Sequence, residues 1–229
     1  MRIRPIMFNT EMVQAIMNDN KTQTRRAPKI QPFLNRNGYW RYGDAVWHKD
    51  NSVSLRCENH LIWKYAPCKP GDILWVRETW NLVLDFDNSD TPIYETERYV
   101  YFADNPMPFD YWVDVNTGEH KEQMPWKPSI HMPKEAARIF LRVKAVRFER
   151  LQEITEVQAL MEGCYMYRTP GEIQPGHDGT AIQDFHRVWD NTVKPAERSD
   201  RGWDANPWVW VIEFERCERP ACWEVYLYG

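Results

Sequence analysis

The segment from Asn20 to Arg26 is the most informative short stretch of this chain. It reads Asn-Lys-Thr-Gln-Thr-Arg-Arg, so one amine, two threonine hydroxyls and two guanidiniums follow one another closely. A hydroxyl beside an amine can act as a nucleophile next to its base. Two neighbouring arginines are suited to recognising a phosphate or a carboxylate. The segment therefore predicts a site for nucleophilic chemistry, for anion binding, or for both.

The backbone of this segment decides which side chains can act together. In an extended strand, Thr24 and Arg26 lie on one face because side chains alternate. Lys21 and Arg25 then lie on the other face. A turn at residues 19–20 would instead bring Lys21 toward Thr24, so both arrangements stay open from the sequence.

Composition sets limits on the partners. The chain has 229 residues, a net charge of −4 and a pI near 5.9. This charge gives no overall basic surface for duplex nucleic acid. Any contact with nucleic acid must come from a local patch, for which Lys21, Arg25 and Arg26 are the obvious residues. Most of the 12 tryptophans are expected to pack in the core.

The cysteines favour a reducing compartment. There are five, an odd number, with no Cys-x-x-Cys pair and no apolar N-terminal run typical of a signal peptide. We expect free thiols, a cytoplasmic protein and no membrane span. Cys57, His60 and Cys68 are conceivable zinc ligands, but their spacing matches no established zinc pattern. We therefore predict no metal and no cofactor.

The elements that position the motif begin at the N-terminus. Residues 3–8 are expected to form a strand and residues 10–18 a short amphipathic helix, with Thr10 as its N-cap. The Lys21 motif leaves that helix. A second strand is expected over residues 73–80, where Glu78 falls on an otherwise apolar face. A buried carboxylate needs a cation, so we predict that Glu78 pairs with Lys21 or Arg26.

The remaining pattern indicates an α+β fold. Strands are expected over residues 99–103, 139–149 and 207–215, helices over 151–163 and 182–189, and a hairpin around Gly43. Scattered strands with a few short helices favour a small mixed barrel over a doubly wound sheet. We predict one domain over residues 1–229, with loop-rich insertions at about residues 30–65 and 85–125.

Several of these segments together resemble the ASCH family, which has a PUA-like β-barrel fold. The similarity is carried by the Lys21–Arg26 run after a short helix, the Pro70-Gly71-Asp72 turn, the helix from Ile154 to Gly163 and the strand that starts at Asn206-Pro207. The whole chain is most similar to phage and prophage ASCH-like proteins labelled "morphogenetic". The resemblance implies a phage-type protein that works in the bacterial cytoplasm.

The resemblance implies that the chain handles a nucleoside or single-stranded RNA. Some ASCH proteins are amidohydrolases that remove the acetyl group from N4-acetylcytidine. Their reactive lysine and threonine correspond to Lys21 and Thr24, and their glutamate corresponds most naturally to Glu162. Here Arg25 stands inside the run and Asp19-Asn20 precedes the lysine, where the family pattern has Gly-Arg.

Other residues complete the expected site. Thr24 would attack the acyl carbon with Lys21 as base, provided that the pKa of Lys21 is lowered. Glu162 would protonate the departing nitrogen or orient a water. Arg25, Arg26 and Glu78 are expected to help bind the substrate, as are backbone donors from Ser129 to His131. Candidates for stacking on the base are Trp75, Trp80 and Trp126.

Two other functions remain open from the sequence. The same cleft could serve a non-catalytic RNA-binding or regulatory module. A role as a phage assembly accessory factor rests only on the label attached to similar proteins. Turnover of acylated nucleosides, salt-dependent RNA binding and co-purification with virion proteins would distinguish the three.

Overall fold

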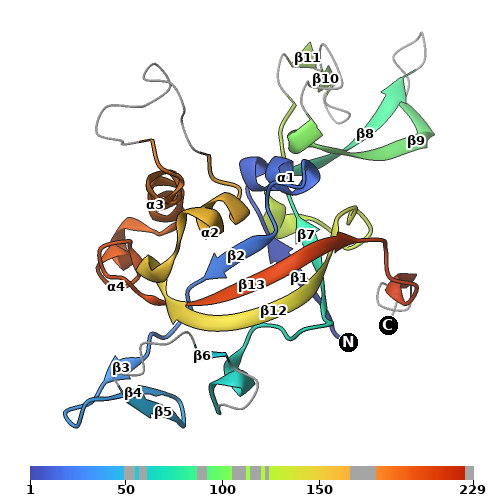
Figure 1. Ribbon diagram of the computed structural model, residues 1–229. Helices are drawn as coiled ribbons and strands as arrows, with labels where there is room; N and C mark the ends of the chain where they lie inside the picture. Colours follow the sequence, from blue (N-terminus) through green and yellow to red (C-terminus); the bar gives the residue numbers. More distant parts are fainter. Residues whose placement is uncertain are drawn as a thin grey trace. The chain divides into compact units, whose positions relative to one another are not determined.

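The computed structural model describes residues 1–48, 55–56, 61–86, 92–104, 112–113, 120–121, 124–165 and 179–224. The secondary structure is α+β, with more strand than helix (Figure 1). The chain divides into two compact units, which we describe separately. Unit 1 comprises Met1–Arg2, Asn18–Ile73 and Arg142–Glu215, and unit 2 comprises Ile3–Met17, Leu74–Leu141 and Arg216–Gly229.

Unit 1 is built on three neighbouring strands. They follow the order β12 (Phe140–Arg150), β13 (Trp208–Cys217) and β2 (Gln23–Arg26), and β6 (Leu55–Arg56) pairs with β12. The first two residues of β12 and the last two of β13 belong to unit 2. The antiparallel register of β2 and β13 places Arg25 opposite Val211 and Thr24 opposite Ile212. Figure 1 shows β2, β13 and β12 running side by side.

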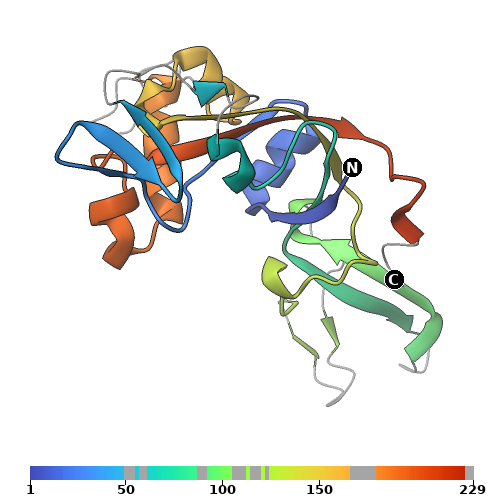
Figure 2. The same ribbon diagram turned by 90° about the horizontal axis from the view of Figure 1, so that it is seen from below.

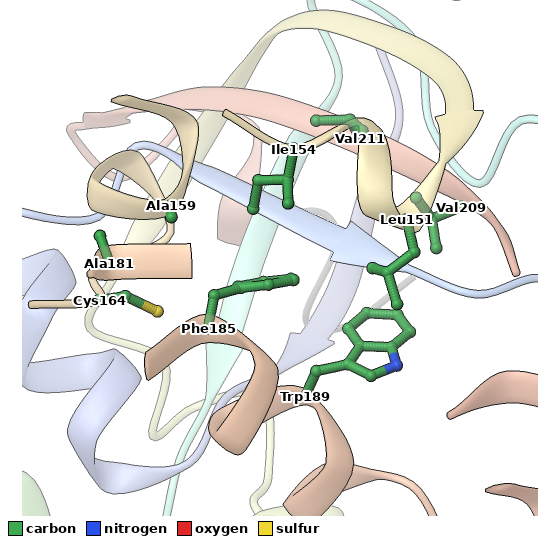
Figure 3. Packing of buried hydrophobic residues seen from close by; sticks show 9 residues of the cluster. All are labelled: Leu151, Ile154, Ala159, Cys164, Ala181, Phe185, Trp189, Val209 and Val211. Atoms are coloured by element: carbon green, nitrogen blue, oxygen red, sulfur yellow. The ribbon is translucent and has the colours of Figure 1, made fainter. Parts of the chain in front are cut away.

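Helices cover one face of these strands. Five elements follow β12 along the chain: η5 (Leu151–Glu153), α2 (Glu156–Met161), α3 (Ala181–Thr192), η6 (Pro195–Glu197) and α4 (Arg198–Arg201). Phe185 and Trp189 of α3 point into a cluster with Ile154, Val209 and Val211 (Figure 3). The cluster also contains Leu151, Ala159, Cys164 and Ala181. Val211 therefore marks the face of the sheet that α2 and α3 cover.

A small second sheet belongs to the same unit. It contains β3 (Phe33–Leu34), β4 (Tyr39–Tyr42) and β5 (Ala45–His48), paired antiparallel, and η2 (Leu61–Tyr65) follows. The turn from β4 to β5 contains Gly43 at φ 59°, a value that L side chains adopt rarely. The predicted hairpin is thus present, inside a region that we expected to be mainly loop.

Unit 2 begins with β1 (Ile3–Met7) and α1 (Thr10–Met17), and β1 pairs with β7 (Ile73–Arg77), whose first residue belongs to unit 1. The long pair β8 (Trp80–Phe86) and β9 (Pro92–Tyr101) follows. The smaller elements are η3 (Phe102–Asp104), η4 (Ser129–His131) and the pair β10 (Trp112–Val113) and β11 (His120–Lys121). Figure 2 shows β8 and β9 as the green hairpin, seen from below.

The structure corrects several expected boundaries. The predicted strand over residues 73–80 is divided, because β7 ends at Arg77 and β8 starts at Trp80. The predicted helix over 151–163 is divided as well, into η5 and α2. The N-cap of α1 is Asn9, whose Oδ1 accepts from the Met12 amide at 2.9 Å, and the predicted Thr10 is already helical. The strand pairs of the described residues do not form a closed barrel.

Candidate functional site

Lys21 and Glu162 meet in the interior of unit 1, 141 positions apart in sequence. The Lys21 Nζ donates to Glu162 Oε2 at 2.8 Å and to the Glu162 backbone oxygen at 2.6 Å. Both side chains are almost completely buried. Glu162, and not Glu78, is thus the acid that faces Lys21, a choice that the sequence left open.

Local backbone chemistry explains how α2 delivers Glu162 to this point. Glu162 ends the helix, and Gly163 follows at φ 86°, the left-handed conformation typical of a helix C-terminus. The amides of Gly163 and Cys164 donate back to Leu160 and Ala159. Since the helix end carries partial negative charge, the Lys21 ammonium on the Glu162 carbonyl stabilises it as well.

The start of β2 is hydrogen-bonded to the end of α2. The Thr22 amide donates to the Met161 oxygen at 2.9 Å, and Lys21 forms an isolated antiparallel bridge with Glu162. The Phe214 amide in turn donates to the Thr22 oxygen at 2.9 Å. Lys21 is therefore fixed by its backbone, and not only by its side chain.

Arg25 extends the pair into a buried network. Its Nη1 donates to Glu162 Oε1 at 3.0 Å, and its Nη2 donates to Glu149 Oε1 at 2.7 Å and to Gln158 Oε1 at 3.1 Å. Arg147 Nε donates to Glu149 Oε2 at 2.7 Å. Arg147 also pairs with Glu213. Six charges thus alternate in sign: Lys21, Glu162, Arg25, Glu149, Arg147 and Glu213.

Burial and the Glu162 carboxylate act in opposite directions on the pKa of Lys21. Burial lowers the pKa of Lys21, while the charge and hydrogen bond of Glu162 oppose that shift and the Arg26 cation adds to it. Burial also lowers the pKa of Arg26, and Glu162 opposes this shift. A lowered pKa increases the fraction of neutral amine at a given pH, which is the direction that a general base needs.

Thr24 lies on the other face of β2. Arg25 shares the face of Val211, and its guanidinium carbon lies 5.7 Å from the centre of the Phe185 ring. Thr24 pairs with Ile212 in register and is therefore directed to the opposite side of the strand. The Glu162 carboxylate accepts hydrogen bonds from Lys21 and Arg25. Among the described residues, the Thr24 hydroxyl forms no hydrogen bond with it.

Glu78 has a different partner from the two that we predicted. Its carboxylate accepts from Arg138 Nε and Nη2, each at 2.9 Å, so Arg138 takes the role expected of Lys21 or Arg26. Arg138 Nη1 donates to Asp104 Oδ2 at 2.8 Å, and its guanidinium lies 3.8 Å from the centre of the Tyr101 ring. This bidentate arrangement, inside unit 2, satisfies a carboxylate that is almost completely buried.

Trp75 and Trp80 are buried among other side chains of unit 2. The Trp75 ring lies 5.8 Å from Trp223, and the Trp80 ring lies 5.7 Å from Tyr99. Lys127 Nζ lies 4.8 Å from the Trp80 ring centre. Neither indole presents the open face that stacking on a base requires, because each is less than a tenth exposed. Trp126 is half-buried and contacts Phe102.

Ser129 and His131 lie in η4 of unit 2, where turn formation already engages one expected donor. The His131 amide donates to the Pro128 oxygen at 3.0 Å. Arg77 reaches across to the carbonyl oxygens of Ile130 and Met132. The His131 amide is therefore not free to stabilise an oxyanion, whereas the His131 side chain is exposed.

Cys164 adjoins the Lys21–Glu162 pair without being a nucleophile. Burial, together with the negative charges of Asp184 and Glu162, raises the pKa of its thiol to about 12. Among the described residues, no three His, Cys, Asp or Glu side chains converge as metal ligands. The suggested ligands Cys57 and His60 lie outside the described residues, and Cys68 is a buried cysteine that forms no disulfide among the described residues.

Sequence reasoning missed the residues that complete the network, Glu149, Gln158 and Arg147. Glu149 lies on a strand whose alternating pattern places it on a buried face, as for Glu78. A buried carboxylate needs a cation, so this position indicated a partner that the sequence did not identify. The network also leaves two buried donors, Arg25 Nε and Gln23 Nε2, without a hydrogen bond among the described residues.

No protein-family model, no curated protein and no solved structure matches this chain. Of the helices that the structure describes, none has the length and apolar character needed to cross a membrane.

Proposed function

We propose that this chain is an ASCH-like protein with a PUA-like barrel topology, acting on a nucleoside or a single-stranded RNA base in the bacterial cytoplasm. We further propose that it hydrolyses an N4-acylated cytidine amide at the Lys21–Glu162 pair. One observation carries the proposal: the 2.8 Å contact between Lys21 Nζ and the Glu162 carboxylate. The family resemblance implied this pairing from positions 141 residues apart.

The proposed reaction is the addition of water to an amide. A water oxygen forms a bond to the acyl carbon while the neutral Lys21 amine takes its proton. The bond from the acyl carbon to N4 breaks as a proton passes to the departing nitrogen through Glu162, giving cytidine and a carboxylic acid. The geometry supports water over the Thr24 hydroxyl as the nucleophile, because Thr24 and Arg25 face opposite sides of β2.

Turnover of N4-acetylcytidine by the purified chain, measured as cytidine released, tests the proposal. Lys21→Met and Glu162→Gln should each lower kcat by about 10²–10⁴-fold, the usual contribution of a general acid or base. Thr24→Val should retain most of the activity if water is the nucleophile. Circular dichroism and thermal unfolding would show whether each variant still folds.

Lys144→Met is the matched control, because this lysine also pairs with a glutamate, Glu215, at 3.0 Å, but on the exposed surface. It should turn over substrate like the unmodified chain. Absence of turnover by the unmodified chain across a panel of acylated nucleosides would remove the enzyme proposal. Loss of activity in Thr24→Val would assign the attack to threonine instead.

The alternative proposal is RNA binding without catalysis, in which the Lys21–Glu162 pair has a structural role. Lys21, Arg25, Glu149 and Glu162 satisfy one another in a buried network, which is the usual state of charges that maintain a fold. In that case Lys21→Met would leave RNA affinity unchanged, because a buried ammonium makes no phosphate contact.

A further inference from the structure

Unit 1 contains a cavity of about 470 Å³ away from the Lys21–Glu162 pair. Its lining includes Lys29, Trp40, Arg150, Ser199, Asp200 and Arg201. These lining residues come from the segment before β3, from β4, from the last residue of β12 and from α4; Figures 1 and 2 show these elements. The cavity has the size of a small-molecule site.

Arg150 is the central cation of this cavity. Its guanidinium carbon lies 5.3 Å from the centre of the Trp40 ring and 5.5 Å from that of Trp208. The two indoles meet edge to face at 5.7 Å. Aromatic contacts engage a guanidinium without using its N–H groups, which lie in its plane. Among the described residues, the Arg150 guanidinium forms no ion pair or side-chain hydrogen bond with an acid, although the Glu153 carboxylate lies close enough to stabilise its charge.

The neighbouring groups hold the cavity in shape. Gln31 Nε2 donates to the Trp208 oxygen at 3.2 Å, and Gln31 Oε1 accepts from the Trp208 amide at 2.8 Å, so the segment before β3 is anchored to β13. Arg201 Nη1 pairs with Glu197 at 2.8 Å, and its Nη2 donates to the Lys29 oxygen. Arg201 is thus engaged in structure, whereas the fork of Arg150 remains available to a ligand.

The chemistry of this lining selects an organic anion. A planar guanidinium with uncommitted donors matches two oxygens of one phosphate, and the exposed Lys29 ammonium adds a second cation. The half-buried Trp40 ring provides an aromatic surface, and Ser199 and Asp200 supply groups that hydrogen-bond to hydroxyls. Inorganic phosphate would engage only the cationic part of the lining.

We propose that this cavity binds a nucleoside monophosphate, with its phosphate on Arg150 and Lys29 and its base against Trp40. The proposal goes beyond the function proposed above, because the cavity shares no residue with the Lys21–Glu162 pair. A negative result for nucleotide binding in the cavity therefore leaves the hydrolysis proposal untouched, and the reverse holds as well.

Isothermal titration calorimetry of the full chain with cytidine 5′-monophosphate tests this site. Binding should be observed, and Arg150→Met should weaken it at least about tenfold, since charge-assisted hydrogen bonds to the phosphate are lost. The affinity of Arg150→Lys should lie between those of the unmodified chain and Arg150→Met, because lysine keeps the positive charge but lacks the two parallel N–H donors of a guanidinium. Lys29→Met, at an exposed position, gives a further test that does not depend on how Arg150 variants fold.

Arg142→Met is the matched control, since Arg142 is an exposed arginine of the same strand that does not line the cavity. It should bind the nucleotide like the unmodified chain. Cytidine alone and inorganic phosphate alone should each bind at least about tenfold more weakly than the nucleotide. Three results would overturn the proposal. They are no nucleotide binding by the unmodified chain, an affinity of both Arg150→Met and Lys29→Met equal to that of the unmodified chain, and inorganic phosphate binding as tightly as the nucleotide.

Discussion

Lys21 contacts two acceptors of one residue, the side chain and the backbone oxygen of Glu162. Burying an ion pair costs desolvation energy, and the attraction between the two charges does not always offset that cost. Here the cost is shared, because Arg25 joins Glu162 to Glu149 and no ion of the set stands alone. The same arrangement that keeps Lys21 in place opposes its deprotonation. The proposed hydrolysis therefore requires the substrate to alter the balance between Lys21 and Glu162.

The Cys164 thiol provides a residue-scale prediction about the same environment. Because burial raises its pKa to about 12, the folded protein should contain almost no Cys164 thiolate at pH 8.5. We expect alkylation of Cys164 by iodoacetamide, followed by peptide mass spectrometry, to be at least about a hundredfold slower in the folded than in the urea-unfolded chain. Equal rates in both states would contradict the buried, protonated thiol.

The sign of the linked pH effect follows from the same shift. At pH values between the ordinary thiol pKa of 9.0 and the folded-state pKa of about 12, the folded state retains a proton that the unfolded state has lost. The free energy of unfolding contributed by Cys164 should therefore decrease as the pH rises through this window, and be fully present below it. Cys164→Ala should lack this component when the two chains are compared by urea unfolding at each pH.

At the scale of elements, the short helix α2 should depend on its cap. The Thr155 hydroxyl accepts from the Gln158 amide at 3.3 Å, and Gln158 Oε1 accepts from the Thr155 amide at 3.0 Å. Thr155→Ala should lower the free energy of unfolding in urea by about 1 kcal/mol. Val157→Ala, at an exposed position of the same helix, is the control and should change it by less than about 0.5 kcal/mol. Equal effects would show that the cap contributes nothing specific.

The sequence was informative where local chemistry determines structure. Gly163 signalled the end of α2, and the run 40–47 signalled a hairpin, because a cap or a tight turn depends on a few adjacent residues. The sequence did not indicate which charged side chains pair with each other. Arg25 meets Glu149 across 124 positions and Glu78 meets Arg138 across 60, and no local pattern encodes which charges will face each other. The family resemblance suggested Glu162 as the acid that acts with Lys21, but the sequence left open whether Glu78 or Glu162 faces it.

The division of β7 from β8 illustrates the same limit. The alternation over residues 73–80 is continuous in sequence, yet the strand stops at Arg77. There the Phe8 amide donates to the Arg77 oxygen, and the Glu78 side chain is directed to Arg138. Tertiary hydrogen bonds, rather than propensity, set this boundary.

At the scale of the whole molecule, net charge constrains any contact with nucleic acid. The chain carries −4, so a polyanion is attracted only by local cations. Arg25, an obvious candidate from the sequence, is buried between two glutamates, so its guanidinium already pairs within the protein. The exposed Lys29 and the Arg150 guanidinium of the proposed nucleotide cavity are better candidates for a phosphate contact than the Lys21 motif.

Single-stranded RNA binding should accordingly show a shallow dependence on salt. With about three phosphates neutralised, the slope of log K against log salt is about −2, so affinity should fall by no more than about 20-fold between 50 and 200 mM salt. Fluorescence anisotropy with a labelled oligoribonucleotide measures this slope, with duplex DNA of equal length as the control that should bind more weakly. A slope far steeper than −2 would require an extended basic surface and would contradict a local patch. An unchanged slope in Arg150→Met would place the RNA contact elsewhere on the chain.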